Sequence, residues 1–102
     1  MEFIKTKEAG ETSYATCFLA TKEEIVRAFG EPSYEEDCIG EKVQNEWDFD
    51  VDGHPVTIYD WKEYRAYDDD EAIEWHIGME WENRDEKFVE SVKAEILERI
   101  KA

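Results

Sequence analysis

The clearest pattern in the chain is an alternation of apolar and acidic residues in W-D-F-D-V at 47–51. A repeat of two residues is typical of a strand that buries one face of its side chains. Asp52-Gly53 follows directly, and this dipeptide favours a two-residue hairpin turn because both turn positions require a positive φ. The pattern therefore predicts a hairpin whose second strand includes I-Y-D-W-K at 58–62.

The position of the turn fixes the register of this hairpin. Phe49 then faces Val56 and Trp47 faces Ile58, so that apolar residues meet on one face. A shift of one residue would turn every side chain to the other face and destroy this agreement. On the opposite face we expect Glu46, Asp48, Asp50, Tyr59 and Trp61.

The same letters contain D-x-D-x-D-G, with which the calcium loop of an EF-hand begins. Such a loop requires a bidentate glutamate at its twelfth position, which is Tyr59 when counting starts at Asp48. Pro55 and the strand pattern on both sides also contradict a helix-loop-helix arrangement. The sequence therefore favours the hairpin and predicts no metal site.

The segments before and after the hairpin each predict one strand and one helix. Residues 13–20 are β-prone, and T-K-E-E at 21–24 is a capping box that begins a helix ending at Gly30. After the hairpin, residues 73–81 alternate again, and Asn83 with Glu86 is expected to cap a final helix. The apolar residues of that helix recur at three- and four-residue spacing and form a stripe that faces the core.

These elements predict a single α+β domain over residues 1–102. The order β-α-β-β-β-α indicates an antiparallel sheet of three or four strands with two helices packed on one face. Phe3-Ile4 is a candidate for a further short strand, and Tyr34 to Glu41 is expected to be a loop.

The charge of the chain limits the partners it can have. It carries 28 acidic and 12 basic residues, a net charge of −16, and residues 46–82 hold 13 acids against Lys62 and Arg65 alone. Because it has no basic patch, we expect it to bind neither nucleic acid nor an anionic membrane. No apolar run has the length of a membrane span and no signal peptide is recognisable, which predicts a cytoplasmic protein.

Other kinds of site find little support in the sequence. Cys17 and Cys38 are interpreted as two reduced thiols, with a disulfide or a metal site as alternatives. His54 flanks the predicted turn and His76 points outward from a strand, and paired carboxylates arise by chance in so acidic a chain. Phosphate-binding loops and nucleophile elbows are absent, so we expect no enzyme and no cofactor.

The outward face of the predicted sheet carries evenly spaced carboxylates. Side chains on one face of a strand are roughly 6.6 Å apart, and like charges in such a row destabilise a sheet. A row of this kind can imitate the phosphates of a duplex and enter a basic groove built for DNA. The alternative is that the charge serves solubility, with Tyr59 and Trp61 as anchors of an ordinary protein interface. The candidate phosphate mimics are Glu46, Asp48, Asp50, Asp68, Asp69, Asp70, Glu74 and Glu80.

Three short motifs carry a resemblance to a known class of proteins. They are F-G-E-P at 29–32, the hairpin at 47–64 with I-Y-D-W-K, and W-H-I-G at 75–78. The chain resembles small acidic proteins encoded by bacteriophages and mobile elements, although Met79 stands where a second glycine is expected. The resemblance implies an inhibitor of host defence, as in anti-CRISPR and anti-restriction proteins that mimic DNA.

Together these observations predict a non-enzymatic inhibitor in the host cytoplasm. Its acidic sheet would block the nucleic-acid-binding channel of a basic host protein such as a CRISPR effector complex. The alternative is an acidic protein-interaction or regulatory module without DNA mimicry, in which the aromatic residues carry the affinity and the acids only speed association.

Overall fold

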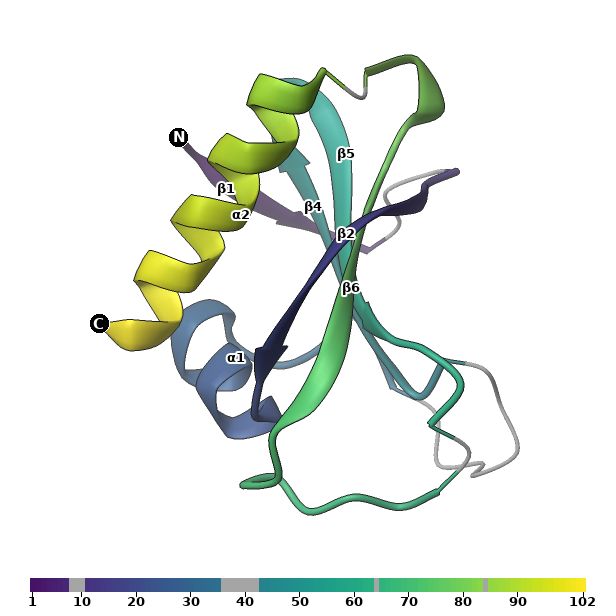
Figure 1. Cartoon of the computed structure of the whole chain (residues 1–102), viewed down its shortest axis with the longest axis vertical. Helices are drawn as coiled ribbons and strands as arrows, with labels where there is room; N and C mark the ends of the chain where they lie inside the picture. The colour runs from purple at the N-terminus through teal and green to yellow at the C-terminus, as the bar shows by residue number, and fades with distance from the viewer. Residues whose placement is uncertain (8–10, 36–42, 64, 84) are drawn as a thin grey trace.

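Both helices pack against the same face of one antiparallel sheet in the computed structural model of the chain (Figure 1). The structure describes residues 1–7, 11–35, 43–63, 65–83 and 85–102. The strand order is β1-β4-β5-β6-β2, and β3 pairs with β4 on the same edge as β1. The elements are β1 (Phe3–Thr6), β2 (Ser13–Ala20), α1 (Lys22–Phe29), β3 (Tyr34–Glu35), β4 (Asn45–Val51), β5 (His54–Asp60), β6 (Ile73–Met79), the 3-10 turn η1 (Trp81–Asn83) and α2 (Glu86–Lys101).

The α+β class and the two helices agree with the sequence, but the sheet has six strands instead of three or four. The element order is therefore β-β-α-β-β-β-β-α. The candidate strand at Phe3-Ile4 is β1, whereas β3 begins at Tyr34, where a loop was expected. Both additional strands are short, and both pair with the outer edge of β4. Strands of four and two residues are too short to show a clear alternation of apolar and polar positions in their own sequences. The rest of the expected loop, 36–41, lies outside the described residues.

The central hairpin has the register that the sequence predicts. Phe49 pairs with Val56 and Trp47 with Ile58. The turn residues Asp52 and Gly53 have φ values of 52° and 86°, as a two-residue turn of this kind requires. The hairpin therefore places its apolar side chains on the helix side and the three acids of β4, Glu46, Asp48 and Asp50, on the other side.

Helix α1 begins at the predicted capping box. The side chain of Thr21 accepts a hydrogen bond from the backbone N–H of Glu24, and the carboxylate of Glu24 accepts one from the backbone N–H of Thr21. The helix ends at Gly30, whose φ of 85° favours glycine. The carbonyl of Gly30 also accepts a hydrogen bond from the indole of Trp47 at 2.8 Å, which ties the helix end to β4.

The end of β6 and the cap of α2 differ from the prediction. Trp81 was expected to continue the apolar side of the strand, but β6 ends at Met79 and Trp81 is 77% exposed. The N-cap of α2 is Asp85, whose carboxylate accepts from the backbone N–H of Lys87, and not Asn83. Aspartate and asparagine are both favoured as N-caps, so the sequence offered two possible starts for this helix. The helix begins after the second of them, Asp85.

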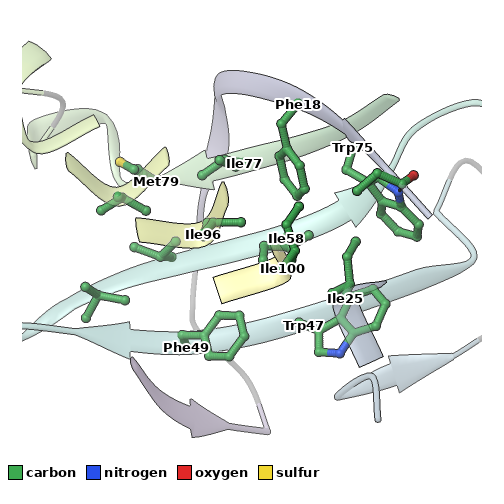
Figure 2. Close-up of a cluster of buried hydrophobic side chains, with 14 of the residues drawn as sticks. Phe18, Ile25, Trp47, Phe49, Ile58, Trp75, Ile77, Met79, Ile96 and Ile100 are labelled. Carbon is green, nitrogen blue, oxygen red and sulfur yellow. Dashed lines mark hydrogen bonds between the residues drawn. The ribbon is translucent and has the colours of Figure 1, made fainter. Parts of the chain in front are cut away.

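The core lies entirely between the sheet and the helices (Figure 2). The rings of Trp47 and Trp75 meet edge to face, with centroids 5.5 Å apart. The indole of Trp75 donates to the carbonyl of Ala20, which satisfies its polar atom inside the core. The helices contribute Ile25, Val92, Ile96 and Ile100, and the strands contribute Phe18, Ala20, Phe49, Val51, Val56, Ile58, Ile73, Ile77 and Met79.

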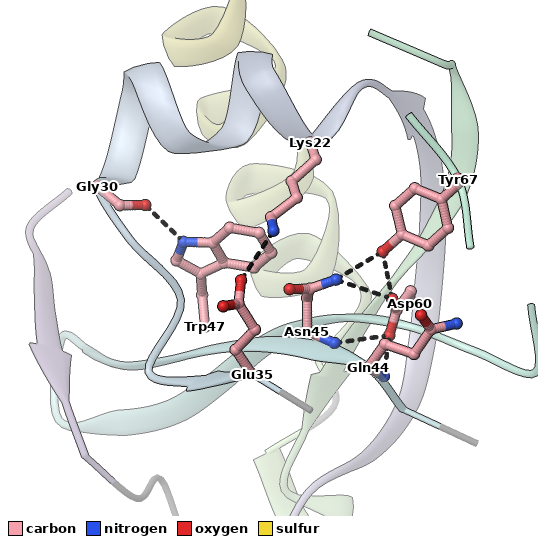
Figure 3. Close-up of polar contacts among 8 residues, drawn as sticks. All are labelled: Lys22, Gly30, Glu35, Gln44, Asn45, Trp47, Asp60 and Tyr67. Atoms are coloured by element: carbon pink, nitrogen blue, oxygen red, sulfur yellow. Dashed lines mark hydrogen bonds and ion pairs between the residues drawn. The ribbon is translucent and has the colours of Figure 1, made fainter. Parts of the chain in front are cut away.

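A buried aspartate fixes the chain at one end of the sheet (Figure 3). Asp60 is 1% exposed and accepts hydrogen bonds from the backbone N–H groups of Gln44 and Asn45 at 2.7 and 3.0 Å. The hydroxyl of Tyr67 and the side-chain amide of Asn45 also donate to Asp60. A buried carboxylate with four donors is well satisfied, and here it holds the start of β4 and the β5–β6 connection together.

Candidate functional site

The sheet face opposite the helices, called the open face below, carries polar and aromatic side chains. No helix in the described part of the chain covers it (Figure 1). The pairing of the strands places Glu46 beside Tyr59, and Tyr59 beside His76, in a row across β4, β5 and β6. The open face is formed by Ile4, Thr6, Tyr14, Cys17, Leu19, Tyr34, Glu46, Asp48, Asp50, Pro55, Thr57, Tyr59, Glu74, His76 and Gly78.

Exposed apolar groups gather on or beside this face. Among the described residues, seven large apolar or aromatic side chains are exposed, and only Met1 and Trp81 lie elsewhere. A set of exposed apolar groups on one face is typical of a surface that binds another molecule, whereas scattered ones need no explanation. The five are Ile4, Tyr14, Leu19, Tyr34 and Trp61.

A pocket of about 660 Å³, called the aromatic pocket below, lies on the open face between the β5–β6 connection and the start of β2. Its volume is within the range of known ligand sites. Three aromatic rings and two carboxyl groups line it, which combines apolar surface with negative charge. Its lining residues are Thr12, Ser13, Tyr14, Val43, Glu46, Tyr59, Trp61, Glu74 and His76.

His76 lies at the centre of the aromatic rings. Its ring centroid is 4.7 Å from that of Tyr14 and 5.5 Å from that of Tyr59, both edge to face, and 6.2 Å from that of Trp61 with the planes 27° apart. Its Nε2 lies 3.4 Å from a carboxylate oxygen of Glu74. The imidazole is therefore held in one place by rings from β2, β5 and the residue that follows β5.

The ring of Trp61 already contacts a cation of the same chain. The Nζ of Lys62 lies 5.5 Å from its centroid, within the usual range of a cation–π contact. Lys62 has a φ of 53°, a left-handed conformation that is uncommon for lysine. Trp61 is 40% exposed, so part of the residue stays accessible to solvent.

Glu46 and Asp48 form a carboxyl pair on β4. Burial, a hydrogen bond with Asp48 and the negative charges of Asp48 and Asp60 raise the pKa of Glu46 to about 8. At neutral pH Glu46 is therefore mostly protonated and donates to Asp48. Asp48 is only 3% exposed, and its Oδ1 has no hydrogen-bond partner among the described residues. The two residues thus present much less charge to solvent than two isolated acids would.

Gly78 makes room for a pair of hydroxyl groups next to the pocket. The side-chain oxygens of Thr12 and Thr57 are 2.9 Å apart. A Cβ atom on Gly78 would lie 2.5 Å from the hydroxyl of Thr57 and 2.9 Å from that of Thr12. The glycine of W-H-I-G is therefore a requirement of packing on the open face.

Four of the ten candidate residues line the aromatic pocket, and the other six lie outside its lining. Glu46, Tyr59, Trp61 and Glu74 line the aromatic pocket. Asp50 instead accepts a hydrogen bond from the backbone N–H of Gly53 at 2.8 Å and stabilises the hairpin turn. Asp48 is buried, Asp68, Asp69 and Asp70 are exposed in the connection between β5 and β6, and Glu80 follows the end of β6.

Sequence reasoning missed Tyr14 and the role of His76. The alternation along β6 places His76 on the outward face, but it does not reveal which strand lies next to β6. The pairing of β2 with β6 brings Tyr14 to Gly78 and Cys17 to His76. That pairing spans about sixty residues of sequence, and the irregular register between Tyr14 and Thr16 further obscures the pattern of β2.

The aromatic pocket is chemically suited to hold a cation. Aromatic faces attract cations, and carboxylates supply the opposite charge. The described residues contain no group of three or more His, Cys, Asp or Glu side chains that could hold a metal ion. Among the same residues, no helix is long and apolar enough to cross a membrane.

Comparisons with models of protein families, with curated proteins and with solved structures gave no match to this chain.

Proposed function

We propose that this protein is a non-enzymatic binding module that attaches to a positively charged partner protein through its open face. The observation that carries the proposal is the aromatic pocket, in which Trp61, Tyr59 and Tyr14 lie beside Glu46 and Glu74. Partly exposed tryptophan and tyrosine side chains in a concave site are the usual energetic anchors of protein interfaces.

The net charge of −16 supports the same kind of partner. A strongly acidic surface attracts a basic one over a distance and raises the rate of association. The acids outside the pocket would then act mainly on the rate of binding, and the aromatic residues on the lifetime of the complex. Binding of this kind weakens as salt is added, because salt screens exposed charges.

The test is affinity capture from a bacterial lysate with Trp61→Ala and a matched control, Trp81→Ala. Both tryptophans are exposed, but only Trp61 lines the pocket. We expect basic proteins to bind the wild type and Trp81→Ala, and the affinity of Trp61→Ala to fall by roughly 30-fold, as for a tryptophan anchor. Equal capture by Trp61→Ala and the wild type would contradict the proposal.

A narrower proposal concerns the identity of the partner. Asp68, Asp69 and Asp70 are exposed in the connection at the same end of the sheet as Trp61 and Glu74. A combined surface of these acids would suit the nucleic-acid-binding channel of a basic protein. With the resemblance to phage and mobile-element proteins, this favours an inhibitor acting in the host cytoplasm on a defence protein such as a CRISPR effector complex.

Competition with nucleic acid tests the narrower proposal. If the captured partner uses its nucleic-acid channel, an excess of duplex DNA or guide RNA displaces this protein. Neutralising Asp68, Asp69 and Asp70 together should also weaken binding at low salt. A partner that binds nucleic acid and this protein at the same time would exclude DNA mimicry while leaving the binding module intact.

A further inference from the structure

We infer that the aromatic pocket binds the guanidinium group of an arginine side chain, with Glu46 and Glu74 as its carboxylate partners. The inference deepens the proposed function and rests on it only for the source of the arginine, which is the basic partner protein. It can be tested separately, because the pocket should bind an arginine side chain in preference to other groups even when no partner protein is present.

The strand pairing places the ring of Tyr59 at the base of the pocket and one acid on each side of it. Tyr59 lies between Glu46 on β4 and His76 on β6, and Glu74 lies two residues before His76. β4 and β6 are two strand spacings apart, roughly 9.6 Å, so the two acids stand on opposite sides of Tyr59, with Glu74 offset by two residues along β6. A cation above Tyr59 would therefore meet rings beneath it and carboxyl groups beside it.

The rings suit a flat cation. Trp61 is 40% exposed, and the ring of Tyr59 meets it edge to face at 6.1 Å. A guanidinium group is planar and weakly hydrated, and it can stack on a ring while it donates two parallel hydrogen bonds to a carboxylate. A guanidinium group already lies over aromatic rings elsewhere in this chain, since that of Arg99 is 4.7 Å from the ring centroid of Phe3 and 5.9 Å from that of Phe29.

An ammonium group fits the site less well. The Nζ of Lys62 already lies over the ring of Trp61, so this chain itself provides an ammonium at that ring. Any partner cation would share this ring with Lys62, but a partner lysine would gain only single hydrogen bonds at the carboxylates. A partner arginine would add bidentate contacts that Lys62 does not make.

Glu46 gives the binding a dependence on pH. The groups that face it are Asp48 on its own strand, Tyr34 on β3, Tyr59 on β5, and Glu74 and His76 on β6. The charge of Asp60 acts on it from the buried side of β5. Its raised pKa of about 8 means that a proton occupies Glu46 at neutral pH, and a guanidinium group must displace it. The affinity should therefore rise with pH below about 8, by up to roughly tenfold per unit, and become constant above it.

The experiment is an NMR titration of the full-length protein with N-acetyl-arginine methylamide, and with the citrulline and lysine equivalents as controls. Citrulline has the shape of arginine without its charge. We expect the arginine probe to shift the indole N–H signal of Trp61 and to bind roughly tenfold more tightly than either control. Calorimetry at pH 7 in two buffers of different ionisation enthalpy should record the release of close to one proton.

Two variants test whether the released proton comes from Glu46. Glu46→Gln should weaken binding of the arginine probe and remove the proton release, so that the remaining pH dependence belongs to the other facing groups. Glu90→Gln, at an exposed position of α2, removes the same charge away from the pocket and should change nothing. Proton release that is unchanged in Glu46→Gln would overturn the assignment to Glu46.

The wild-type titration decides the inference even if a variant fails to fold. Equal binding of arginine and citrulline, equal binding of arginine and lysine, or no binding of arginine would each overturn it. These results are distinct from failure of the proposed function. A basic partner that requires Trp61 but whose arginine-to-lysine variants bind unchanged would support the binding module and exclude the arginine site.

Discussion

Gly78 on β6 lies opposite Thr57 on β5, so close that a Cβ atom on Gly78 would lie 2.5 Å from the threonine hydroxyl. Distances below about 3 Å do not occur between such atoms without movement of one of them. The Thr57 hydroxyl cannot simply turn away without losing its contact with Thr12, 2.9 Å away. The absence of a side chain at Gly78 therefore lets the hydroxyl groups of Thr57 and Thr12 lie against β6 beside the aromatic pocket.

Gly78→Ala should therefore destabilise the protein. Alanine normally stabilises a strand relative to glycine, but overpacking here should lower the free energy of unfolding by about 1–3 kcal/mol. Urea denaturation followed by tryptophan fluorescence measures the change. In a Thr57→Ala background the loss should be smaller, because one of the two clashing hydroxyls is gone. An equal loss in both backgrounds would show that the clash with Thr57 is not the cause.

Asp50 should act on stability through a hydrogen bond and not through its charge. Its carboxylate accepts from the backbone N–H of Gly53, and an asparagine oxygen can accept the same bond. We expect Asp50→Ala to lower the free energy of unfolding by about 0.5–1 kcal/mol and Asp50→Asn to leave it nearly unchanged. Thermal unfolding of the three proteins at one pH tests this, and similar losses in both variants would refute it.

Loss of the hydrogen bonds to Asp60 should destabilise the end of the sheet where the start of β4 meets the β5–β6 connection. Tyr67→Phe deletes a hydroxyl that donates to Asp60, and we expect a loss of about 1–2 kcal/mol. Asp60→Asn should cost at least as much, because its NH2 group, in the place of Oδ2, would face the donating side-chain amide of Asn45 and the hydroxyl of Tyr67. Hydrogen exchange at residues 43–47 should increase in both variants.

The control for this prediction is Asp70→Asn, which changes an exposed acid in the same connection. A surface change of this kind should alter the free energy of unfolding by less than about 0.5 kcal/mol. If Asp70→Asn and Asp60→Asn had equal effects, the loss would reflect net charge and not the buried hydrogen bonds.

Glu46 should make stability depend on pH in the alkaline direction. Its pKa is raised from 4.5 to about 8 on folding, so the folded protein keeps a proton that the unfolded chain releases in this interval. The stabilisation is complete below about pH 4.5 and is lost as the pH rises to about 8. Because the side chain is partly exposed, we expect a loss of only about 1–2 kcal/mol.

Glu46→Gln isolates this contribution. The variant cannot ionise at this position, so it should match the wild type near pH 5 and exceed its stability near pH 9 by about 1–2 kcal/mol. Urea unfolding at both pH values measures the difference. A constant difference across the interval would mean that Glu46 titrates normally in the folded protein.

The parts of this fold that depend on neighbouring residues follow from the sequence. The turn at Asp52-Gly53, the capping box at Thr21 and the stripe of α2 are all set by residues within one or two turns of chain. The strand β3 does not, because it is two residues long and exists through hydrogen bonds supplied by β4. The short strand β1 was expected only as a candidate at Phe3-Ile4, and its pairing with β4 is likewise non-local.

The candidate site could be predicted only in part for the same reason. Alternation alone places Glu46, Tyr59 and His76 on one face, but the pairing of β2 with β6 brings Tyr14 to them. The burial of Asp48 is also non-local, since it stands between Thr6 of β1 and Thr57 of β5. Regularly spaced acidic residues in the sequence of β4 therefore do not form a regular row of exposed charges in the structure.

The one-sided core has a consequence for how such a protein can evolve. Along β4 and β6, the residues that form the core alternate with residues of the open face. Substitutions at every second position can therefore change the chemistry of the open face while Trp47, Phe49, Trp75 and Ile77 stay in place. Divergence among descendants of this chain should concentrate on the open face, with Gly78 and the buried Asp48 as fixed points within it.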